Sequence, residues 1–179
     1  RGDPVSEIFW ATQAGYPLLA TLQWLPLAGG LLLLVMREQD LALILGRLFA
    51  IGELVVAIDL HARIDVSRNV MQFAERFDLL AYHAAADGIS VLFILLTALL
   101  GVLLSFYGMA RQQISPVQLL SVLLLIESVQ MTMLTTLNLL WFAAASAVQL
   151  ALVAYLLWRW ASASEENLAL SRFLQYQFF

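Results

Sequence analysis

The sequence predicts an all-α, polytopic membrane protein with about five transmembrane helices. Of the 179 residues, 62% are hydrophobic and only 12% are charged, and the mean hydropathy is +0.85. A soluble domain usually has about half of its residues apolar and about a quarter charged. The apolar residues also form long runs, and a helix needs about 20 of them to cross a bilayer. Composition and run length therefore both predict a chain embedded in a membrane.

The predicted membrane domain covers residues 16–160 and follows a polar segment, 1–15, that lacks the composition of a signal peptide. An amphipathic loop separates the second and third spans, and its residues 70–83 have the pattern of a surface helix. The last segment, 161–179, opens with serines and two glutamates, and is predicted to be an amphipathic interfacial helix or the start of a sixth span. The five predicted spans are 16–36, 41–60, 87–109, 116–136 and 137–160.

The residue types that are missing exclude several classes of function. The sequence has no cysteine and no lysine, which removes disulfides, thiolate chemistry and Schiff-base chemistry. No nucleophile, zinc-protease or phosphate-loop motif is present. The net charge is -4 without a basic cluster, which argues against a nucleic-acid partner. We therefore expect no independent catalysis, no metal site and no cofactor.

Two glutamates lie in the middle of predicted spans. Glu53 is in the second span and Glu127 in the fourth, and at about 1.5 Å per residue each lies near the mid-plane of the bilayer. Ionisable side chains at this depth are costly, and they often mark a proton path or a polar axis. The alternative is that each glutamate is protonated or hydrogen-bonded and only ties helices together. Arg47 does not face Glu53, because a separation of six residues turns a helix by about 240°.

The stretch YHAAADGIS, residues 82–90, precedes the third span. His83 and Asp87 have the spacing of two metal ligands on a helix, but a metal site needs about three or four ligands and only one other histidine exists. Asp87, Gly88 and Ser90 have instead the pattern of a helix N-terminus, where a carboxylate accepts hydrogen bonds from free backbone N–H groups. We expect these residues to cap the third helix and anchor the loop, with metal binding or acid–base catalysis as the alternative.

The same stretch, with the following VLFILLTALLGVL, resembles the H-x-x-x-D-G-I-S entry to the third helix in chain M of bacterial complex I. That chain is an antiporter-like subunit of the proton-pumping NADH:quinone oxidoreductases. Other segments are similar to this family in the same order: WLPLAGGLLLLVM to its first helix, LLLIESVQ to its fourth-helix glutamate motif, and ALSRFLQYQFF to its approach to helix six. The resemblance covers nearly the whole chain. It matches Glu127 to a family glutamate and assigns no family role to Glu53.

Two departures from the family's pattern concern its proton chemistry. The resemblance places Asn138, in NLLWF, where the family has an aspartate, and Ala147 where it has a proton-handling glutamate. Neither side chain can carry a proton at physiological pH. The family's pumping subunits also have many more helices, with proton-transferring lysines in the later ones. The resemblance therefore implies a form truncated to about the first five helices, or the observed part of a longer subunit.

These features favour a non-pumping, antiporter-like subunit that is a structural or accessory component of a complex-I-like membrane assembly. Its expected surroundings are the lipid bilayer and other membrane subunits, in the bacterial inner (cytoplasmic) membrane. The alternative is an energy-coupling subunit of a proton/cation or inorganic-carbon transport complex, in which a partner supplies the missing proton groups. Under either hypothesis, any oxidoreductase or ion-translocating activity belongs to the whole assembly.

Overall fold

The computed structural model describes residues 14–65, 71–77, 82–107, 115–160, 172–173 and 175–176. Within these ranges, five helices are long and apolar enough to cross a membrane. The predicted all-α membrane fold with about five spans is therefore confirmed, and the chain is an integral membrane protein. The helices are α2 (Leu18–Val35), α3 (Gln39–Arg63), α4 (Gly88–Tyr107), α5 (Pro116–Thr135) and α6 (Leu139–Trp160).

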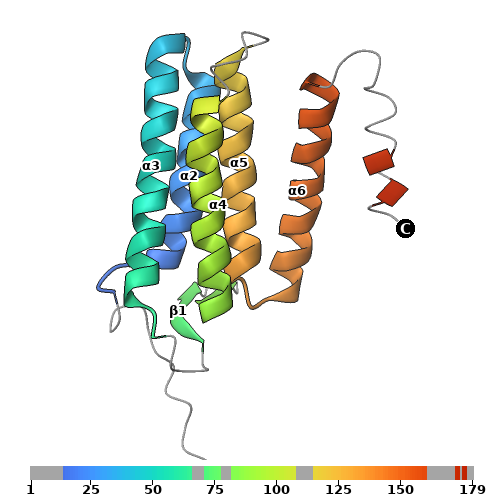
Figure 1. Ribbon diagram of the computed structural model, residues 1–179. Coiled ribbons are helices and arrows are strands. Elements are labelled where there is room, and N and C mark those ends of the chain that lie inside the picture. The colour runs from blue at the N-terminus through green and yellow to red at the C-terminus, as the bar shows by residue number, and fades with distance from the viewer. Residues whose placement is uncertain are drawn as a thin grey trace, which may run out of the picture.

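The helices run alternately up and down, and α5 occupies the central position among them. In Figure 1, α2, α3, α4 and α5 form one group, while α6 stands beside this group. α5 packs against each of the other four helices, and α6 packs mainly against α5. Much of the α6 surface is therefore exposed, whereas α2 is half buried by its neighbours.

Small residues allow the close approach of α2 and α5. A methyl group at Gly30 would lie 2.8 Å from the Leu125 side chain and 3.0 Å from the backbone oxygen of Ser121. These distances are too short for an unshifted side chain, so only glycine fits at this crossing. Such contacts are typical of membrane helices, which associate through close packing because lipid offers no hydrophobic driving force between them.

A two-stranded antiparallel sheet lies at one end of the helix group. β1 (Gln72–Phe77) pairs with β2 (Tyr82–Ala86), and a bulge interrupts the register between Gln72 and Glu75. The surface helix predicted over residues 70–83 is therefore wrong. Phe73 has a φ of 56°, which a right-handed helix does not contain, and its side chain is buried in the core. Long-range contacts of the hairpin thus override the local amphipathic pattern.

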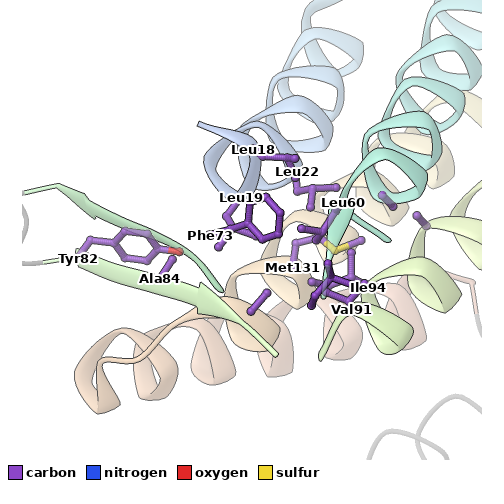
Figure 2. Close-up of a cluster of buried hydrophobic side chains, with 14 residues drawn as sticks. Leu18, Leu19, Leu22, Leu60, Phe73, Tyr82, Ala84, Val91, Ile94 and Met131 are labelled. Carbon is purple, nitrogen blue, oxygen red and sulfur yellow. The ribbon is translucent and has the colours of Figure 1, made fainter. Parts of the chain in front are cut away.

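Buried apolar side chains form two clusters, one toward each end of the helices. Figure 2 shows the cluster at the hairpin end, where Leu22, Phe73, Ile94 and Met131 come together from α2, β1, α4 and α5. The second cluster joins the opposite ends of α2, α3 and α5 through Leu33, Leu43, Leu120 and Leu124.

The helix bounds differ from the predicted spans mainly at α3. This helix is longer than predicted and continues to Arg63, whose Nε donates to Asp59 Oδ1 at 2.8 Å across the last turn. The predictions for segments 1–15 and 161–179 lie almost entirely outside the described residues.

Candidate functional site

Glu53 and Glu127 meet in the interior of the membrane domain. Glu53 comes from α3 and Glu127 from α5, and their carboxyl groups lie within interaction distance of each other. Both residues are buried, with exposed fractions of 0% and 4%. α4 closes the site with Gly101, where a methyl group would overlap with Glu127 Oε1. The sequence predicts the depth of both glutamates, and the structure adds that they face each other.

The carboxyl pair has few hydrogen-bond partners. Both carboxyl oxygens of Glu53, and Oε1 of Glu127, are buried without a partner among the described residues. Two ionised carboxylates at this position would repel each other and would both lose their hydration. The arrangement is therefore suited to binding protons or a small cation.

Arg47 is the other charged residue away from the ends of α3, and it interacts with α4. Its Cζ lies 5.1 Å from the centroid of the Phe106 ring, which is a cation–π geometry. Its Nε and Nη2 atoms are buried without a hydrogen-bond partner in the described part of the chain. This position agrees with the prediction that Arg47 and Glu53 point in different directions.

A row of hydroxyl groups on α5 faces α2. Ser121, Ser128 and Thr135 follow one another at intervals of seven residues, and all three are buried. Ser121 Oγ donates to the Gly30 carbonyl and Ser128 Oγ donates to the Gln23 carbonyl, each at 2.8 Å. Gln23 Nε2 donates in turn to Thr135 Oγ1 at 2.7 Å. Sequence reasoning missed this row, although the seven-residue spacing of hydroxyl side chains is a visible signal.

Tyr82 joins the hairpin to the helices. Its hydroxyl oxygen accepts a hydrogen bond from Gln23 Nε2 of α2. Its ring lies edge-on to that of Trp141 in α6, with centroids 5.7 Å apart and an interplanar angle of 90°. Burial raises the pKa of Tyr82 above its ordinary value, so the hydroxyl stays neutral within this contact.

Glu75 of β1 caps α2 from a distant part of the chain. Its Oε1 accepts the N–H of Leu19 and its Oε2 accepts the N–H of Ala20, each at 2.8 Å. Free N–H groups and the helix dipole both favour a carboxylate at this position. Burial nevertheless raises the pKa of Glu75, and the two backbone hydrogen bonds oppose this effect only in part. The sequence does not reveal this cap, because more than fifty residues separate its members.

His83 and Asp87 do not form a joint site. His83 lies in β2, and its backbone carbonyl accepts the N–H of Leu137 at 2.9 Å. Asp87 caps α4, which begins at Gly88: Asp87 Oδ1 accepts the Ser90 N–H at 2.7 Å. Hydrogen bonds from Ser90 hold the pKa of Asp87 below its ordinary value. The described part of the chain contains no group of three or more residues that could hold a metal ion.

The two positions where the resemblance implies lost proton groups lie at the start of α6 and within it. Asn138 precedes this helix, and its Oδ1 accepts the Leu140 N–H at 2.9 Å, which makes Asn138 the N-terminal cap. Ala147 lies on the exposed face of α6. Neither position belongs to the carboxyl pair, which lies among α3, α4 and α5.

Fold and site together define a polytopic α-helical membrane protein with a carboxyl pair buried between its helices. No known family model and no curated protein matches the chain. Its function is therefore inferred from the geometry of the helices and of the buried polar groups.

Proposed function

We propose that the chain is a structural or accessory subunit that packs against a partner in a larger membrane assembly. The exposed face of α6 carries this proposal. Ala143, Ala144, Ala147 and Ala151 are all exposed, and their spacing places them on one side of the helix. In membranes, small residues mark the faces where a second helix approaches closely.

The exposed face of α4 differs in a way that supports this interpretation. Its exposed residues include Leu92, Phe93, Leu96 and Leu103, which are large side chains of the kind that face lipid. On α6, the exposed Leu140 and Trp158 lie toward the two ends of the alanine face, and Val148 is an exposed larger side chain beside its middle. A face that is small in the middle and large at its ends fits a helix better than it fits fluid lipid.

The resemblance described above supports a complex-I-like assembly in the bacterial inner (cytoplasmic) membrane. It implies neighbours of the antiporter-like or quinone-reductase class. Asn138 caps α6 and Ala147 is exposed, so the positions matched to family carboxylates supply no proton group here. We therefore infer a non-pumping role for this chain, in which α6 provides a contact surface.

The test is purification from the native membrane in mild detergent, with mass spectrometry of every co-purifying chain. Ala147→Trp places a bulky ring in the middle of the alanine face and is expected to abolish recovery of the partner. Leu96→Trp on α4 is the matched control, because Leu96 is 50% exposed and belongs to the lipid-facing type of surface. Recovery of the wild-type chain alone, or unchanged partner recovery with Ala147→Trp, contradicts the proposal.

A second candidate is an energy-coupling subunit of a proton/cation or inorganic-carbon transport complex. The observation that favours it is the buried pair of Glu53 and Glu127 at mid-depth. Such a subunit would take the rest of its proton groups from a partner. Proton flux into vesicles that contain the full assembly is then expected to disappear with Glu127→Gln, and flux that persists in this variant excludes the candidate.

A further inference from the structure

No positively charged side chain among the described residues is paired with the carboxyl groups of Glu53 and Glu127. Among the described residues, α2 has no ionisable side chain, α4 has only Tyr107, and α5 has only Glu127. The other ionisable residues of α3 lie toward its ends, apart from Arg47, whose guanidinium lies over Phe106. Each carboxyl of the pair therefore has the other carboxyl as its electrostatic neighbour.

The pair also lies in a position that is built to hold it. Gly101 on α4 leaves room for the Glu127 carboxyl, since any larger residue there would overlap with its oxygens. Glu53 is fully buried, and neither of its carboxyl oxygens has a hydrogen-bond partner among the described residues. Buried polar atoms almost always have a partner, and a proton on one carboxyl would supply a donor for an oxygen of the other.

A proton satisfies this arrangement with no further group. A protonated carboxyl has one O–H donor, whereas an ionised one has only acceptors. If the two carboxyls are protonated, each can donate to the other, and the pair then places no net charge in the low-dielectric interior. Neutralisation in this way is the usual response of a carboxyl to burial beside another carboxyl.

We propose that Glu53 and Glu127 form a proton-binding site in the membrane interior, in which the two acid groups hydrogen-bond to each other and hold α3 against α5. The site belongs to this chain alone and does not depend on a partner at α6. The failure of either proposal therefore leaves the other intact.

Infrared spectroscopy of the purified chain in detergent tests this proposal, because a protonated carboxyl has a C=O absorption that an ionised carboxylate lacks. Glu75→Gln is used as the background, since Glu75 is another buried carboxyl. At neutral pH we expect the carboxylic acid absorption in this background. Adding Glu53→Gln and Glu127→Gln is expected to abolish it. Absence of the absorption at neutral pH, or its persistence in the triple variant, overturns the proposal.

A second measurement separates a proton from a cation and needs only the Glu75→Gln protein. The carboxylic acid absorption is followed at neutral pH in sodium chloride and in choline chloride at equal ionic strength. It is expected to be the same in both salts and to disappear only when the pH is raised. Loss of the absorption in sodium chloride alone would show that the pair is a sodium site, and would overturn the proton assignment.

Discussion

Among single residues, Glu75 is expected to make the stability of the protein depend on pH, because its carboxyl group is buried. Burial raises its pKa above the ordinary value of 4.5, so the folded protein binds this proton more tightly than the unfolded chain. Its contribution to stability is therefore greatest below pH 4.5 and is lost as the pH rises through the raised pKa. Thermal unfolding in detergent across this range is expected to show the decline in the wild type and a smaller decline in Glu75→Gln.

The contribution of Asp87 to stability is expected to depend on pH in the opposite direction. Its pKa is held below 3.8 by hydrogen bonds from Ser90, so its cap stabilises the protein above that pH and loses its effect as the pH falls below it. Asn caps a helix about as well as Asp. At neutral pH, Asp87→Asn should therefore unfold at the same temperature as the wild type. As the pH is lowered, its stability should fall less than that of the wild type. If the stability of Asp87→Asn falls at acid pH as much as that of the wild type, the Asp87 cap is not the cause of this fall.

Gly101 is expected to be the least replaceable glycine beside the carboxyl pair. Gly101→Ala forces the buried Glu127 carboxyl to move, whereas a methyl group at Gly52 meets only the Leu25 side chain at 3.5 Å. Alanine favours a helix over glycine by about 1 kcal/mol. Thermal unfolding should therefore show Gly52→Ala to be neutral or stabilising and Gly101→Ala to be destabilising. Shortening the side chain with Glu127→Ala should remove the penalty of Gly101→Ala, and additive effects of the two changes would refute the proposed overlap.

Between elements, the hydroxyl row of α5 is expected to hold α2 in place. Ser128→Ala removes a hydrogen bond to the Gln23 carbonyl, and such bonds between membrane helices contribute about 0.6 kcal/mol on average. Ser146→Ala is the matched control, because Ser146 Oγ donates to the Phe142 carbonyl within α6 itself. Unfolding in detergent should show a loss of stability for Ser128→Ala and little change in stability for Ser146→Ala. Equal effects of the two substitutions would mean that the interhelical bond contributes nothing.

The helices could be predicted from the sequence because their signal is local. An apolar run long enough to cross a bilayer needs no information about its neighbours, and the five runs all became helices. The hairpin could not be predicted, because β1 and β2 depend on contacts with α2, such as those of Glu75 and Tyr82. The same limit applies to the site. The depth of Glu53 and Glu127 follows from residue counting, but their meeting follows only from how α3 and α5 pack.

At the scale of the whole molecule, the hairpin end gathers three helix N-termini. α2 is capped by Glu75, α4 by Asp87 and α6 by Asn138, and each cap comes from a side chain outside the helix that it serves. The carboxyl pair lies deeper, between the two apolar clusters, and α6 takes no part in it. Polar groups are therefore concentrated in α2, α3, α5 and the hairpin, while the outer face of α6 is left apolar, with alanines in its middle.

This separation predicts the result of placing carboxylates at the two positions that the resemblance matches to acidic residues. Ala147→Glu places an acid on the outer face of α6, where a charged side chain near the centre of a span costs about 3 kcal/mol. Combined with Asn138→Asp, it should lower the yield of inserted protein and should create no proton flux in vesicles that contain the chain alone. The reason is that position 147 is directed away from the Glu53 and Glu127 pair, so no continuous polar path forms. Vesicles with the unsubstituted chain are the control, and flux that appears only in the double variant would show that the outer face of α6 does connect to the buried pair.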